Sequence, residues 1–155
     1  MKHDHIINAR GTYTPLGVSR SSREAYDEAV GMLFSALDHL DNLLAGQRYL
    51  AGRQISEADW RLFTTLIRFD TVYFTHFKTN RRRIADYHHL GPYLRELYQV
   101  PGVADTVDMN DIRRHYYLSH KDLNPFGIIP IGPELDLDRS SGRENVGFSS
   151  ERFAL

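Results

Sequence analysis

The sequence predicts an all-α helical bundle followed by a long extended C-terminal tail. Apolar residues recur at helical spacing across residues 24–46 and again across residues 57–78, and a capping-box pattern accompanies the start of each stretch. From Asn124 onward, prolines and glycines are too frequent for a helix to persist. We therefore expect a lead-in segment at residues 1–20, a helical domain at residues 21–123 and an extended tail at residues 124–155.

The composition limits the kinds of partner that the protein can have. A chain of 155 residues suits one domain with a proper core. Its formal net charge of -1, from 19 basic and 20 acidic residues, gives no field that would attract nucleic acid or an anionic membrane. The absence of cysteine excludes disulfides, thiolate metal sites and thiol nucleophiles within this chain. No apolar run approaches the ~18 residues that span a bilayer and no signal peptide is evident, so we expect a cytoplasmic protein.

The first predicted helix follows an irregular lead-in segment. Gly11, Pro15 and Gly17 interrupt any regular period near the N-terminus. The pattern Ser21-x-x-Glu24 then forms a capping box, and Gly46 ends the helix. The apolar face of this helix is formed by Tyr26, Ala29, Val30, Leu33, Phe34, Leu37, Leu40, Leu43 and Leu44.

The start of the second predicted helix has two independent signals. Ser56 can accept a hydrogen bond from the amide of Asp59, while the Asp59 carboxylate reaches back to the amide of Ser56. Ile55 and Trp60 occupy the flanking positions of a hydrophobic staple. We assign these four residues a structural capping role. The apolar spacing continues to Lys78, which predicts one long helix packed antiparallel to the first.

The remaining predicted elements are shorter. Pro92 suits the first position of a helix that runs to about Tyr98 and stops at Pro101-Gly102. Asp108 can cap a further helix, on which His115 and Tyr116 share a face. The residues after this helix predict an extended tail that lies across the domain.

Several polar residues admit more than one role. The chain has eight histidines, but the pairs His3/His5, His88/His89 and His115/His120 have poor spacing for metal ligands, so we expect no metal site. Arg68 and Asp70 can bind substrate, although an ion pair that organises the helix end is the favoured interpretation. The triplet Arg81-Arg82-Arg83 indicates either a solvated polar turn or a docking surface for glutathione or another domain.

Ordered motifs through the chain carry a family resemblance. From about Glu24 to about Gly142 the sequence resembles the C-terminal domain of glutathionyl-hydroquinone reductases, which are Xi-class, omega-like glutathione transferases. The motifs are the capping box with its staple, Arg48-Tyr49-Leu50, Arg68-Phe69-Asp70, Val72-Tyr73, Thr75-His76-Phe77-Lys78, Arg83-Ile84, Asp86-Tyr87, Arg95-Glu96-Leu97-Tyr98-Gln99, Arg113-x-His115-Tyr116, Ser119-His120-Lys121 and Asn124-Pro125-x-Gly127-Ile128-Ile129-Pro130-x-Gly132-Pro133.

The resemblance implies a two-domain enzyme and a homodimer. In the family, a thioredoxin-like domain binds glutathione and carries the catalytic cysteine in a Cys-Pro-Trp-Ala motif, which this sequence lacks. The family reaction reductively removes glutathione from a glutathionyl-hydroquinone. We therefore expect this chain to be inactive alone and to need the thioredoxin-like domain as a partner.

The resemblance also implies three substrate-binding tyrosines: Tyr13, Tyr73 and Tyr116. A phenol with a pKa near ~10 stays protonated at neutral pH, so it can donate a hydrogen bond to a hydroquinone oxygen. The alternative is that these tyrosines belong to the core. The chain has nine tyrosines, so three on helix faces are expected by chance. The family resemblance favours the pocket for Tyr73 and Tyr116.

Two functional classes follow from the sequence. The first is the hydroquinone side of a composite glutathione-dependent active site. The second is a non-catalytic helical scaffold, derived from a glutathione transferase, for dimerisation or partner docking. In both, an apolar surface left exposed would favour a dimer or larger assembly.

Overall fold

The computed structural model describes residues 23–147, and within this range the chain is helical without a strand. The α-helices are α1 (Arg23–Gly46), α2 (Glu57–Arg68), α3 (Phe74–His76), α4 (Leu90–Tyr98) and α5 (Met109–Ser119). A π-helical turn, Phe69–Tyr73, joins α2 to α3, and two 3-10 turns lie at Ile84–Asp86 and Ala104–Thr106. The predicted all-α fold is confirmed for these residues.

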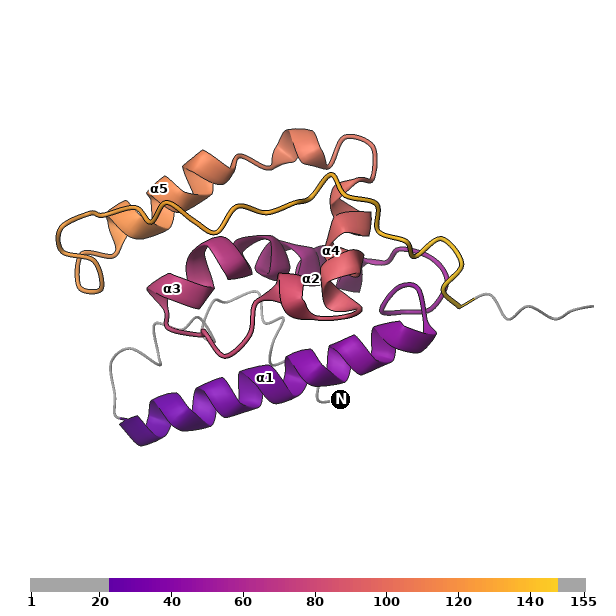
Figure 1. Ribbon diagram of the computed structural model, residues 1–155, viewed down its shortest axis with the longest axis horizontal. Helices are drawn as coiled ribbons and strands as arrows, with labels where there is room; N and C mark the ends of the chain where they lie inside the picture. The colour runs from indigo at the N-terminus through magenta and orange to yellow at the C-terminus, as the bar shows by residue number, and fades with distance from the viewer. Residues whose placement is uncertain (1–22, 148–155) are drawn as a thin grey trace, which may run out of the picture.

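The main core lies between α1, α2 and α4. Helix α1 buries one face, which consists of Val30, Phe34, Leu37, Leu40 and Leu44. The segment α2–α3 runs in the opposite direction to α1, and α4 packs against both α1 and α2 (Figure 1). Large buried side chains from all three helices fill this core, because apolar residues at helical spacing place one face of each helix toward the interior.

The predicted long helix at residues 57–78 is interrupted, so the prediction of one continuous helix was wrong. α2 ends at Arg68, and the π-helical turn brings four consecutive residues, Phe69 to Val72, into the interior. An ordinary α-helix would carry some of them to the surface. Lys78 then adopts a φ of 61°, in the left-handed region that ends helices.

The inward turn gives Asp70 a capping role. Its carboxylate accepts hydrogen bonds from the Ile84 amide at 2.6 Å and from the Ala85 amide at 3.0 Å. Arg68 donates instead to the Thr64 carbonyl at 2.6 Å. The ion pair favoured for Arg68 and Asp70 therefore does not form, because the π-helical turn points the carboxylate toward the following loop.

The start of α4 also differs from the prediction in one detail. Helix α4 begins at Leu90, which makes Pro92 its third residue rather than its first. The position still tolerates proline, since amides of the first turn have no partner within the helix. The Asp41 carboxylate of α1 accepts from the amides of His89 and Leu90, both at 2.8 Å, and so caps α4 from outside.

The tail runs without a helix from Asn124 to Gly147, first along α5 and then over α4 toward the end of α1 (Figure 1). Its backbone is held by side chains from the helices. Arg113 donates to the Pro133 carbonyl at 2.9 Å, and Gln99 donates to the carbonyls of Leu137 and Arg139 at 2.7 and 2.8 Å. The tail is therefore extended and attached across the domain.

Candidate functional site

A second, smaller cluster lies where α5 crosses the end of α3. Val72, Phe77 and Tyr117 are buried in it, and half-buried side chains surround them. The π-helical turn supplies Tyr73, and the helix start at Asp108 fixes α5; the Asp108 carboxylate accepts from the amides of Asn110 and Asp111, each at 2.9 Å. The partly buried members of the cluster are Tyr73, Ile112, Tyr116, Leu123 and Ile129.

Tyr73 and Tyr116 meet in this cluster, although 43 residues separate them. Their hydroxyl oxygens are 3.4 Å apart, and their ring centroids are 5.9 Å apart in an edge-to-face arrangement. The Phe77 ring contacts both, with centroid distances of 5.4 Å to Tyr73 and 6.0 Å to Tyr116. Tyr13, the third tyrosine singled out by the family resemblance, lies outside the described residues.

The surroundings of Tyr73 favour a protonated phenol. Burial raises the pKa of Tyr73 well above its ordinary value, and the hydrogen bond with Tyr116 raises it further. Tyr73 therefore keeps its proton throughout the physiological range. A half-buried phenol of this kind can donate a hydrogen bond to an oxygen of a bound molecule.

A hollow of about 470 Å³ is bordered by Phe77 and His76. Phe77 packs on both tyrosines, whereas neither Tyr73 nor Tyr116 is among the described lining residues of the hollow. The Tyr26 hydroxyl donates to the Lys78 carbonyl at 2.6 Å and so ties the start of α1 to the end of α3. The described lining residues are Arg23, Tyr26, His76, Phe77, Lys78, Asn80 and Leu123.

Two histidines complete the cluster. His76 Nε2 and His120 Nδ1 are 2.9 Å apart, and the two rings stack with an interplanar angle of 19°. Sequence reasoning paired His120 with His115 and gave His76 no partner. No local signal links His76 to His120, because these residues are 44 positions apart and meet only in the folded chain.

Both imidazoles of this pair are neutral at pH 7. Burial, together with a smaller effect of the nearby His120, lowers the pKa of His76 to about 4. Burial also lowers the pKa of His120, with a smaller contribution from His115. In a neutral pair, one ring donates its N–H to the unprotonated nitrogen of the other.

The four predicted capping residues lie at the start of α2, away from this cluster. The carboxylate of Asp59 is fully buried and accepts from the Ser56 amide at 2.8 Å and from the Ser56 hydroxyl at 2.6 Å. It also accepts from the Leu50 amide at 2.8 Å and from the Tyr93 hydroxyl at 2.7 Å. Ile55 and Trp60 pack half-buried against the main core.

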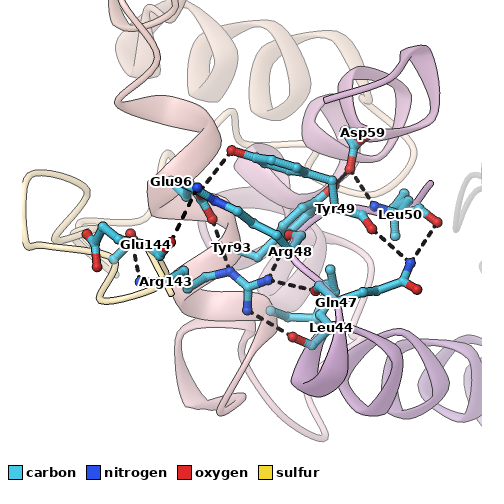
Figure 2. A network of polar contacts seen from close by, with 12 residues as sticks. Leu44, Gln47, Arg48, Tyr49, Leu50, Asp59, Tyr93, Glu96, Arg143 and Glu144 are labelled. Carbon is cyan, nitrogen blue, oxygen red and sulfur yellow. Dashed lines mark hydrogen bonds and ion pairs between the residues drawn. The ribbon is translucent and has the colours of Figure 1, made fainter. Parts of the chain in front are cut away.

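A charged network anchors the tail next to Asp59 (Figure 2). The Glu96 carboxylate of α4 accepts from Arg48 at 2.6 Å, from the Tyr49 hydroxyl at 2.9 Å and from Arg143 at 3.1 Å. Arg143 is only 2% exposed, although it belongs to the tail. Its guanidinium also donates to three backbone carbonyls, those of Leu44, Gln47 and Arg48, at 3.1, 3.2 and 2.8 Å.

Sequence reasoning missed this network. Arg48, Tyr49 and Glu96 stand in recognised motifs, but no role could be given to them because each partner lies 47 or 48 residues away. We call the set Arg48, Tyr49, Glu96 and Arg143 the tail clasp. Its groups satisfy one another, which indicates a structural role.

Among residues 23–147, no three histidine or acidic side chains come together in a way that would hold a metal ion. None of the described helices is long and apolar enough to cross a membrane.

Residues 23–99 match the family described as glutathione S-transferase, C-terminal domain. The chain belongs to this family. The resemblance read from the sequence motifs is thereby confirmed, and it extends to the Xi class. Membership of this family also accounts for the helical architecture, since solved structures of Xi-class glutathione transferases superpose on the chain.

Two curated relatives share much of this C-terminal domain. It is 55% identical over 124 residues to glutathionyl-hydroquinone reductase YqjG of Escherichia coli strain K12, a match that covers 80% of the chain and 38% of the relative. It is 47% identical over 133 residues to glutathionyl-hydroquinone reductase PcpF of Sphingobium chlorophenolicum, covering 82% of the chain and 42% of the relative. The chain thus spans about two fifths of the length of these relatives.

Solved structures also resemble the C-terminal domain. The glutathione-bound structure of YqjG from Escherichia coli K-12 superposes with a TM-score of 0.84 at 50% identity, covering 91% of this chain and 45% of that chain. An Xi-class glutathione transferase from Natrialba magadii superposes with a TM-score of 0.83 at 48% identity, covering 94% and 47%. The similarity therefore includes the tail as well as the helices.

Proposed function

We propose that this domain forms the hydroquinone-facing side of a composite active site that reductively removes glutathione from glutathionyl-hydroquinones. The observation that carries the proposal is the meeting of the Tyr73 and Tyr116 hydroxyls, 3.4 Å apart. Support also comes from the relatives, which are named for this activity.

The phenols would act as hydrogen-bond donors to the hydroquinone oxygens. Tyr73 keeps its proton, because burial raises its pKa, and a donor held in place stabilises negative charge that develops on a leaving phenol. The Phe77 ring, packed between the tyrosines and the hollow, offers a face against which an aromatic guest can stack. Tyr13 is a third candidate donor.

The thiol chemistry would come from a thioredoxin-like domain, since this chain has no cysteine. The cysteine thiolate of that domain attacks the thioether sulfur, the ring carbon takes a proton, and free hydroquinone leaves. A mixed disulfide with glutathione remains on the cysteine. A second glutathione then attacks this disulfide, which regenerates the thiol and releases oxidised glutathione. In this scheme glutathione is bound mainly by the thioredoxin-like domain.

The proposal extends to organisation and assembly. We place a linker or lead-in segment at residues 1–20, the helical domain at 21–123 and the tail at 124–155, in a cytoplasmic homodimer. Support for association comes from three large apolar side chains of the tail, Phe126, Ile128 and Ile131, which are 88%, 66% and 95% exposed. Light scattering at micromolar concentration tests the dimer, and a strictly monomeric particle would contradict it.

The experiment that tests the function supplies the thioredoxin-like domain by fusion or in trans. Release of hydroquinone from a glutathionyl-hydroquinone is measured for the parent chain and for Tyr73→Phe and Tyr116→Phe. Each substitution removes one donor while keeping the ring, so we expect kcat/KM to fall by roughly 100-fold if the phenol acts as an oxyanion-hole donor does. Tyr98→Phe is the matched control, because Tyr98 is half-buried against the main core.

Two outcomes would contradict the proposal. Full activity in both tyrosine variants would remove the site assignment. No hydroquinone release with the thioredoxin-like domain present, together with a stable dimer, would favour the alternative of a non-catalytic dimerisation or docking scaffold.

A further inference from the structure

We propose that His76 and His120 are positioning residues, which as a neutral hydrogen-bonded imidazole pair hold the end of α5 against α3 and thereby keep the Tyr116 phenol against that of Tyr73. The inference rests on the proposed function, because it concerns the same two phenols. It assigns a role to two residues that stand in the family motifs without one, and it gives a pH range in which the site is intact.

The two pairs form matching connections between the same elements. Tyr73 and His76 lie three residues apart on one side, and Tyr116 and His120 lie four residues apart on the other. Residues at these spacings project from the same side of a helical segment. The Phe77 ring packs against both connections, at 5.4 Å from Tyr73 and 5.9 Å from His120. A displacement of the histidine pair would therefore also displace the tyrosine pair.

The imidazole hydrogen bond is shorter than two other polar contacts between these segments. His76 and His120 are 2.9 Å apart, compared with 3.3 Å from the Tyr117 hydroxyl to the Thr71 carbonyl and 3.4 Å between the hydroxyls of Tyr73 and Tyr116. The His120 ring also contacts that of Tyr116, with a centroid distance of 5.7 Å. The histidine pair thus has both the bond and the ring contact needed to position Tyr116.

Protonation weakens the pair in two stages, and the second stage removes the hydrogen bond between the imidazoles. A first added proton brings a charge among the rings of Phe77, Tyr116 and Tyr117, where burial disfavours it. A second proton leaves N–H groups on both contacting nitrogens, so that neither can accept the hydrogen bond.

Among the described residues, the charges that shift the pKa values of the pair are those of imidazoles. His115 of α5 acts electrostatically on His120 and lowers its pKa. From the other side, Arg23 of α1 and Lys78 after α3 line the hollow that His76 borders. The phenol rings of Tyr117 and Tyr116 on α5 contact His76 and His120 edge-on. We therefore expect acid to loosen α5 at a pH below the ordinary imidazole pKa.

The test is NMR of the 155-residue chain without ligand. The observable is the cross-relaxation between the Tyr73 and Tyr116 rings as the pH is lowered from 7 to 4. We expect the wild-type signal to fall at least threefold. In the double variant H76Q/H120N the side-chain amides stand where Nε2 and Nδ1 stood and cannot titrate, so its signal should persist. His88→Gln, at an exposed loop position, is the control that should behave as wild type.

Two results would overturn the inference. One is a wild-type ring contact that persists unchanged to pH 4, and the other is an equal acid loss in H76Q/H120N, which would assign the loss to carboxylates elsewhere. If the double variant does not fold, the histidine titrations of the wild-type chain decide. Both imidazoles should titrate below ~6.5, and a value at or above this for either would contradict a neutral pair.

Binding of plain hydroquinone separates this inference from the proposed function. His120→Phe keeps a ring but loses the bond, and we expect it to weaken hydroquinone binding at pH 7 by about tenfold, the typical effect of one hydrogen bond. His120→Asn should restore the affinity. If hydroquinone does not bind even to the wild type while the ring contact depends on pH as expected, the proposed function fails and the positioning role stands.

Discussion

The tail clasp differs in construction from the tyrosine–histidine cluster, which we define as Tyr73, Tyr116, His76 and His120. Both are polar assemblies that join distant parts of the chain. In the clasp, one buried carboxylate receives two guanidinium groups and a phenol at 2.6 to 3.1 Å. In the cluster, no formal charge is present at pH 7, the phenols are half-buried, and their hydroxyls are 3.4 Å apart.

The difference implies that the clasp is rigid, whereas the cluster can exchange its hydrogen-bond partners. Charged groups with all partners present hold their geometry, because losing one partner leaves a buried charge unpaired. Two phenols at a long separation lose little when a third oxygen arrives, so a guest can share their hydrogen bonds. The clasp is therefore suited to holding the fold, and the cluster to receiving a ligand.

The sharpest way to break this comparison is Glu96→Ala. The substitution leaves Arg143 buried and both arginines without their shared carboxylate, so we expect the free energy of unfolding to fall by roughly 3 to 5 kcal/mol. Urea denaturation measures it. Glu57→Ala is the matched control, since Glu57 makes an exposed ion pair with Arg61 and should cost less than about 1 kcal/mol. Equal effects of the two substitutions would contradict the structural role of the clasp.

Asp59→Ala should have the next largest effect. It deprives the amides of Leu50 and Ser56 and the hydroxyl of Tyr93 of a buried acceptor, and we expect a loss of about 3 kcal/mol in urea denaturation. Ser56→Ala removes a hydroxyl from the same site and should cost only about 1 kcal/mol. A loss for Asp59→Ala no greater than that for Ser56→Ala would show that the carboxylate acts only as a helix cap.

The stability of the chain should also depend on pH through the histidine pair. Folding lowers the pKa of His76 to about 4, whereas an imidazole in the unfolded chain has a pKa of about 6.5. The unfolded state therefore binds more protons between these values, so stability is fully present above about pH 6.5 and declines as the pH falls toward 4. The loss that comes from His76 is on the order of 3 to 4 kcal/mol, since one pKa unit corresponds to about 1.4 kcal/mol.

The variant H76Q/H120N isolates this contribution. Its unfolding free energy, measured by urea denaturation across the same pH range, should decline less steeply than that of the wild type. Parallel curves would mean that other groups cause the acid sensitivity.

The smallest expected effect on stability belongs to the tyrosine pair itself. Tyr116→Phe removes a long hydrogen bond from a half-buried site and should change the free energy of unfolding by less than about 1 kcal/mol. The same substitution is expected to lower hydroquinone release strongly. A large loss of stability would place Tyr116 with the structural residues and erase the contrast between the two regions.

Local features were predictable from the sequence, and long-range ones were not. The start of α2 was recognisable because Ser56 and Asp59 lie three residues apart, and the start of α5 because Asp108 caps its own helix. The π-helical turn was missed, since it depends on how the interior accommodates Asp70 rather than on apolar spacing.

The same limit applied to the candidate site. Tyr73 and Tyr116 were singled out by family resemblance, because nothing in their spacing brings residues 43 positions apart together. The partners of Glu96 and His120 had no such support, so neither the tail clasp nor the histidine pair was foreseen. Both require the packed helices before their members can meet.

The bond from Arg143 to the Leu44 carbonyl joins residues 99 positions apart and has a consequence for assembly. Closing so long a loop costs entropy, and that cost is recovered only after the helices that bury the guanidinium are in place. During synthesis on the ribosome, Glu96 emerges with Arg48 already available but with its second cation still untranslated. We therefore expect the final ordering step of the nascent domain to be the docking of this one arginine.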